Sequence, residues 1–165
     1  MDEFRLSFTP TLWFLPTDNK IKTNLSQVWF PGAHSDVGGS YSDARPFDSS
    51  DLSLLWMIHQ VQSLLSIDVE RLYSGFTPEG EKSYDGIKWT AAQPIHNSMT
   101  GAFAGGTHTI RTPGKYTKME NVDNPTDHVG PQMEKVHWSV RLRAIKAKKQ
   151  GIRTAQKVVG RNMVR

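Results

Sequence analysis

The sequence predicts an α/β fold with few strands, long loops rich in glycine and proline, and an incomplete sheet. Residues 26–30, SQVWF, form a short apolar run that Pro31 and Gly32 end, a pattern typical of a buried strand in a parallel sheet. Residues 49–66 are predicted to form an apolar helix. Most of the remaining chain is predicted to be loop, and structureless segments longer than about 15 residues are uncommon in a whole compact domain. We therefore expect part of a domain rather than a complete one.

The helix at 49–66 has a start signal and an apolar stripe. Ser50 is expected to cap it, and Asp51 places negative charge in its first turn. Four apolar residues recur along one stripe: Leu54, Ile58, Val61 and Leu65. Three further apolar residues after Leu54 widen this stripe, so we expect the helix to be buried on more than one side. A second helix is expected to begin near Ser139.

Composition restricts the chemistry of the chain. It has 165 residues, which is one domain's worth, and 37% of them are hydrophobic. The absence of cysteine excludes disulfides, thiolate metal sites and a cysteine nucleophile. No apolar run approaches the roughly 18 residues of a membrane helix. The start, MDEFRLSF, lacks the apolar stretch of a signal peptide, so a cytoplasmic location is expected.

Charge is distributed unevenly along the chain. The net charge is +4, yet residues 135–165 hold ten Lys or Arg and no Asp or Glu. Residues 1–134 hold the other ten Lys or Arg and all sixteen Asp or Glu, so this part of the chain is acidic. We expect residues 146–165 to be a helical or frayed basic tail that follows a domain at 1–145. Residues 135–165 could contact an anionic surface weakly. Nucleic-acid binding is not expected, because Trp138 is the only aromatic residue in 135–165 on which a base could stack.

A histidine and a carboxylate follow the predicted strand. Catalytic groups of open α/β sheets gather at the carboxyl ends of strands, and imidazole is the usual base that activates a serine hydroxyl. His34 is therefore a candidate catalytic residue. Asp36 is expected to support its loop by accepting hydrogen bonds from amides near Gly38 and Gly39. His34 and Asp36 could also bind a metal ion, but the other histidines lack ligand spacing, so neither metal nor cofactor is expected.

The other histidines have simpler expected roles. His59 lies on an apolar side of the predicted helix and should be buried and hydrogen-bonded. His96 and His108 lie in loops and should be solvated. His137 is expected to make a structural hydrogen bond.

The stretch VWFPGAHSDVGGSY, followed by DLSLLWMI, resembles the signature of the Tle1-like phospholipase domains of type VI secretion effectors. Upstream, DEFRLSFTPTLW resembles another segment of that family. Downstream, IHNSMTGAF, RTPGKY and VHWSVRLR resemble its closing segments, so the likeness extends from residue 2 to about residue 145. It implies that residues 1–145 are the C-terminal part of an α/β-hydrolase domain.

The resemblance implies a Ser-Asp-His esterase mechanism on lipid or other ester substrates, with His34 as the base. The chain order in such hydrolases is serine, acid, histidine. A Gly-x-Ser-x-Gly nucleophile elbow and the acid are therefore expected before residue 1. Ser40, in GGSYS, follows the base and does not join a strand to a helix, so it is not the expected nucleophile.

Two functional readings follow from the missing nucleophile. In the first, the chain is a partial phospholipase-like hydrolase that is inactive alone. In the alternative, it is a non-enzymatic truncated module that binds a protein partner or an anionic surface through its basic tail.

Overall fold

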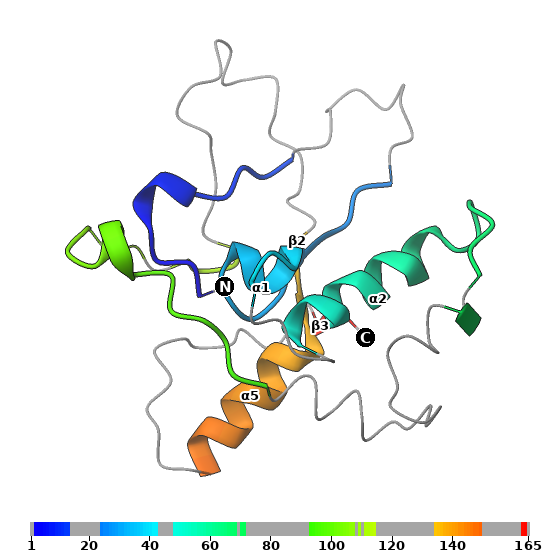
Figure 1. The fold of residues 1–165 in the computed structure, drawn as a ribbon. Helices are drawn as coiled ribbons and strands as arrows, with labels where there is room; N and C mark the ends of the chain where they lie inside the picture. The colour runs from blue at the N-terminus through cyan, green and yellow to red at the C-terminus, as the bar shows by residue number, and fades with distance from the viewer. Residues whose placement is uncertain are drawn as a thin grey trace.

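A computed structural model of the chain (Figure 1) describes residues 2–13, 24–42, 48–68, 70–71, 93–107, 109, 111–114, 134–149 and 163–164. Its elements in chain order are η1 (Leu6–Phe8), β1 (Gln27–Trp29), α1 (His34–Gly38), α2 (Ser49–Val61), η3 (Gly101–Phe103), β2 (Glu134–His137), α5 (Trp138–Lys149) and β3 (Met163–Val164). Helices and parallel strands together are compatible with the predicted α/β class.

The sheet of the described residues has three short strands in the order β1-β2-β3, and both pairs are parallel. Val28 lies opposite Lys135, and Val136 lies opposite Met163. The parallel strand predicted at 26–30 is confirmed as β1, but its residues are half-buried rather than buried. The order explains this difference, since β1 has a described neighbour on one side only. Strands β2 and β3 were not predicted.

Aromatic side chains connect β1 to β2 and α2. Phe30, 6% exposed, stacks on His137 with ring centroids 4.5 Å apart and meets Trp56 edge-on at 5.9 Å. Beside them, Val136 and Val140 form a small buried cluster against Trp29. This modest core fixes the strand end from which the chain passes to His34.

The main helix is confirmed as α2, but its cap was predicted wrongly. Asp48 is the N-cap residue, because its carboxylate accepts a hydrogen bond from the backbone N–H of Ser50 at 2.8 Å. The Ser50 hydroxyl donates to the same carboxylate oxygen at 2.5 Å. The helix ends at Val61, and residues 62–65 continue it only as turns and a bend.

The expectation that α2 is buried on more than one side is wrong. Its buried apolar residues are Leu52 and Ile58. Leu54 and Met57 on the predicted apolar part of the helix are about half exposed, at 45% and 52%. The described part of the chain therefore covers one side of this helix.

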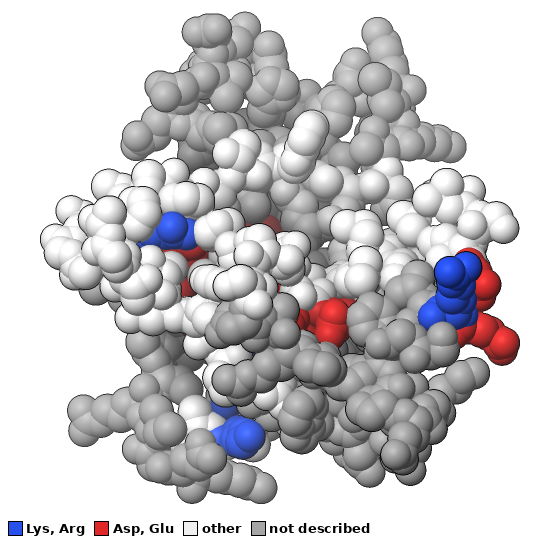
Figure 2. Space-filling model, viewed as in Figure 1, with Lys and Arg blue, Asp and Glu red and all other residues white. Residues whose placement is uncertain are grey.

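The second predicted helix is confirmed as α5, which begins at Trp138. Apart from β3 and the end of α5, the basic tail at 146–165 lies outside the described residues, and so do His108 and His128. On the face seen in Figure 2, the described charged side chains lie in small separate groups, with both signs present. Among the described residues, no helix has the length and apolar character needed to cross a bilayer.

His137 should make the stability of the fold depend on pH. Burial lowers the pKa of His137 to about 4, whereas an exposed histidine titrates near 6.5. The unfolded chain therefore binds this proton more readily, so the stability is fully present above about pH 6.5 and is lost as the pH falls toward 4. The loss should amount to about 3 kcal/mol over this interval.

Urea unfolding between these pH values checks this expectation. A His137→Gln variant can still offer a hydrogen bond to the Ser139 hydroxyl, which lies 2.7 Å from His137 Nδ1. The variant should show a flatter pH dependence than the parent chain. Equal slopes in the two proteins would contradict a neutral buried His137.

Candidate active site

His34 stands directly after the β1 strand. The backbone turns at Gly32, whose φ is +97°, and α1 then begins at His34. A short helix thus replaces the loop that was expected here. Both ends of this helix are stabilised. The N–H of Ala33 donates to the Asp36 carboxylate at 2.8 Å, and Gly39 ends the helix in the left-handed conformation with φ +74°.

The N-terminal segment lies against this turn. The N–H of Gly32 donates to the Asp2 carboxylate at 2.6 Å, and the N–H of Asp2 donates to the Gly32 carbonyl at 3.0 Å. This reciprocal pair brings the next residue, Glu3, to the imidazole of His34. Glu3 Oε2 lies 2.9 Å from His34 Nδ1.

Two groups compete for His34 Nδ1, because Arg5 Nη2 lies 2.8 Å from the same nitrogen. A protonated Nδ1 donates to Glu3, whereas a bare Nδ1 accepts from Arg5. The other ring nitrogen, Nε2, lies 3.0 Å from the Ser35 hydroxyl. In the first tautomer Nε2 accepts the Ser35 proton, and in the second Nε2–H donates to Ser35. Glu3, His34 and Ser35 therefore form a carboxylate–imidazole–hydroxyl line.

Glu3 is an ionised carboxylate in a buried position, since only 4% of the residue is exposed. Burial opposes its ionisation, but hydrogen bonds, chiefly from Arg5 and His34, outweigh burial and hold the pKa of Glu3 well below its usual range. Arg5 binds the carboxylate through both Nε and Nη2, at 2.9 and 2.8 Å. A fixed negative charge therefore faces the imidazole of His34.

Aromatic rings hold the imidazole and the guanidinium in place. Phe8 stacks on His34 with centroids 4.8 Å apart. The guanidinium of Arg5 lies 3.8 Å from the centroid of Phe8 and 4.8 Å from that of Phe103. About half of the His34 side chain remains exposed, so a reactant could reach it from solvent.

Asp36 supports the turn in a different way from the one predicted. Its carboxylate accepts hydrogen bonds from the N–H of Ala33 and of His96, instead of from amides near Gly38 and Gly39. A side chain at the third position of a helix points back to the helix start, which explains the difference. Asp36 Oδ1 also lies 2.6 Å from Nδ1 of His96, whose ring stacks on Tyr41 at 3.6 Å. The expectation that His96 is merely solvated is therefore wrong.

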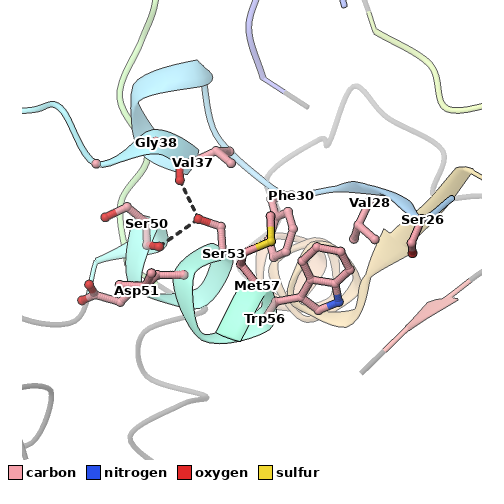
Figure 3. A pocket seen from close by; sticks show the side chains of 12 residues that line it. Ser26, Val28, Phe30, Val37, Gly38, Ser50, Asp51, Ser53, Trp56 and Met57 are labelled. Atoms are coloured by element: carbon pink, nitrogen blue, oxygen red, sulfur yellow. Dashed lines mark hydrogen bonds between the residues drawn. The ribbon is translucent and has the colours of Figure 1, made fainter. Parts of the chain in front are cut away.

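Gly38 and Gly39 lie at the far end of α1, toward α2. A Cβ on Gly39 would approach the Ser50 hydroxyl to 3.2 Å, so this glycine permits close packing. Ser53 connects the two helices, because its hydroxyl donates to the Val37 carbonyl at 2.5 Å (Figure 3). Whether Gly38 and Gly39 support catalysis at His34 stays a prediction.

A cavity of about 640 Å³ lies between β1 and α2, bordered by the end of α1 (Figure 3). Val28 and Phe30 line it from the strand, and Trp56 and Met57 line it from the helix. His34 does not line this cavity. The cavity is therefore separate from the carboxylate–imidazole–hydroxyl line.

The remaining described histidines do not join this line. His59 is exposed on α2, against the prediction of a buried residue, and lies 3.3 Å from the amide nitrogen of Gln62. His137 makes the structural hydrogen bond to Ser139 that was expected. No group of three or more His, Asp or Glu side chains in the described part of the chain could hold a metal ion.

Sequence reasoning missed Glu3, Arg5 and Ser35 as partners of His34. The sequence only weakly indicated Glu3 and Arg5, because these two charged residues directly precede the mostly apolar stretch at 6–14. Ser35 was visible only as part of the motif around His34. The contact between Glu3 and His34 joins residues 31 positions apart, which spacing alone does not predict.

Comparison with known proteins supports the resemblance seen in the motif. Residues 1–60 match the family model described as "T6SS, Phospholipase effector Tle1-like, catalytic domain". The match includes Glu3, Arg5, His34, Ser35 and most of α2. No curated protein and no solved structure matches the chain.

Proposed function

We propose that this chain, whose first 60 residues match a Tle1-like phospholipase catalytic domain, is the histidine-bearing part of an ester hydrolase with an α/β-hydrolase fold. His34 is the general base of this hydrolase. The observation that carries the proposal is the line of Glu3, His34 and Ser35, with a carboxylate at one ring nitrogen and a hydroxyl at the other. This is the arrangement that activates a serine hydroxyl in hydrolases.

Glu3 selects the tautomer of His34 that catalysis requires. When Nδ1–H donates to the buried carboxylate, the bond is charge-assisted and Nε2 is left without a proton. Nε2 then takes the proton of a serine hydroxyl as its oxygen attacks the ester carbonyl. The imidazolium next gives the proton to the departing alcohol oxygen. Glu3 stabilises the imidazolium between these two steps. In this proposal Glu3 takes the role of the triad acid, in place of the acid expected before residue 1.

The nucleophile of the proposed reaction is a serine outside residues 1–165. Ser35 marks the place such a hydroxyl must reach, because it lies 3.0 Å from Nε2. Ser35 itself is buried at 8% exposure and lies within the single turn of α1. It therefore lacks the exposed strand-to-helix elbow from which a hydrolase serine attacks its substrate. In the assembled site the incoming serine takes the place of Ser35 at Nε2.

Ester hydrolysis by two proteins tests the proposal. One is the 165-residue chain, and the other, the extended product, is the chain joined to the protein sequence encoded directly upstream of Met1. Both are offered phosphatidylcholine vesicles and an activated short-chain ester. We expect the extended product to hydrolyse phosphatidylcholine and the 165-residue chain to be inactive, because the proposed nucleophile lies outside residues 1–165.

Two results would contradict this expectation. Hydrolysis by the 165-residue chain that disappears in a Ser35→Ala variant would place the nucleophile within the chain. An extended product that hydrolyses neither ester, together with a chain that binds anionic vesicles, would favour the non-enzymatic alternative.

A further inference from the structure

We propose that Arg111 is a positioning residue that holds Glu3 and Phe8 against His34. The inference rests on the proposed function of His34, since it concerns the geometry of the same site. Arg111 belongs to the RTPGKY stretch, to which neither the sequence nor the mechanism assigned a role in catalysis.

Arg111 clamps the backbone of the N-terminal segment. The residue is 4% exposed, and its Nε donates to the carbonyl of Glu3 at 2.5 Å. Its Nη2 donates to the carbonyl of Arg5 at 3.3 Å and also to the carbonyl of Phe8. One guanidinium therefore binds three carbonyls within six consecutive residues.

These three residues are the ones that hold the imidazole. The Glu3 carboxylate lies 2.9 Å from Nδ1, Phe8 stacks on the ring, and Arg5 fixes the Glu3 carboxylate. The hydrogen bonds of Arg111 to the carbonyls of Glu3, Arg5 and Phe8 connect it to His34 through these residues. The planar fork of a guanidinium can reach several acceptors in fixed directions, which the point charge of lysine cannot reproduce.

Neighbours of Arg111 in the chain hold the same segment. The N–H of Phe4 donates to the Ser98 hydroxyl at 3.1 Å, and the N–H of Thr109 donates to the Phe4 carbonyl at 3.0 Å. A hydrogen bond from Ser98 also helps lower the pKa of Glu3. Ser98, Thr109 and Arg111 thus form a second layer behind the residues that contact His34, and Arg111 is its charged, buried member.

Nitrogen-15 NMR of histidine-labelled chain tests this role, because it reports which ring nitrogen of His34 carries the proton. In the parent chain we expect Nδ1–H to predominate at neutral pH. In Arg111→Lys the ratio of Nδ1–H to Nε2–H should fall about fivefold, since the hydrogen bond to Glu3 is weakened. In a Glu3→Gln background, Arg111→Lys should change the ratio no further, because Arg111 acts through Glu3.

Arg143→Lys is the matched control. Arg143 on α5 also donates from a partly buried guanidinium to a backbone carbonyl, that of Gln93. This variant should lose thermal stability and keep the parent tautomer ratio. Arg111→Gln, which keeps planar N–H donors without the charge, replaces Arg111→Lys if the lysine variant does not fold.

The outcomes separate a positioning role from a structural one. A folded Arg111 variant with the parent tautomer ratio would overturn the inference, and so would failure of both variants to fold. An equal shift in Arg143→Lys would also overturn it. The NMR readout needs no turnover, so loss of the Nδ1–H tautomer in an enzyme that proves inactive would sustain the role of Arg111 and reject the proposed function.

Discussion

Replacing Glu3 with glutamine should lower kcat for phosphatidylcholine hydrolysis by the extended product about 10³- to 10⁴-fold. The amide of glutamine can donate a hydrogen bond to Nδ1, which favours the tautomer with a proton on Nε2. That nitrogen then cannot accept the proton of the nucleophile. Since glutamine matches glutamate in size, the fold should persist, and steady-state kinetics with a thermal melt measure both properties.

Asp51→Asn is the control for this substitution. Asp51 lies in the first turn of α2 and lines the cavity that His34 does not line, so the same change of carboxylate to amide should leave kcat within about twofold. Equal losses in the two variants would mean that Glu3 has no specific role. Full activity of the Glu3→Gln protein would show that another carboxylate orients His34.

Replacing Gly32 with alanine should destabilise the 165-residue chain by about 3 kcal/mol or more. The φ of Gly32 is +97°, a conformation that residues with a side chain rarely adopt. A Cβ at this position would lie 2.4 Å from Cβ of Asp36 and 2.8 Å from its Oδ2. The clash would displace the carboxylate that accepts from Ala33 and His96, so the turn before His34 should open.

Urea unfolding measures this loss, with Gly38→Ala as the matched control. Nothing lies within 4 Å of a Cβ on Gly38, which is helical, so alanine should change stability by no more than about 1 kcal/mol in either direction. Equal unfolding midpoints for Gly32→Ala and the parent chain would contradict the tight turn that positions His34.

The sequence predicted the features of the fold that depend on neighbouring residues. The apolar run before Pro31 indicated a strand, the stripe around Leu54 and Ile58 indicated a helix, and His34 was placed directly after the strand. Each signal lies within one short segment. The cap of α2 was missed by two positions because Asp48 and Ser50 are both good capping residues, and only the geometry distinguishes them.

Contacts between distant residues could not be predicted in the same way. Glu3 reaches His34 across 31 positions, and Arg111 reaches Glu3 across 108 positions. Polar residues in loops offer many possible partners, and the fold selects among them. Strand β2 was missed because EKVH is short and half polar, so its pairing with β1 depends on tertiary contacts.

Hydrolysis of phosphatidylcholine by a His34→Ala variant of the extended product tests the central claim most directly. We expect kcat to fall at least about 10³-fold with little change in thermal stability, because about half of the His34 side chain is exposed. His96→Ala is the matched control, since His96 is also paired with a carboxylate but lies outside the proposed catalytic line. It should retain most of the activity. A His34→Ala protein as active as the parent would contradict the assignment of His34 as the general base.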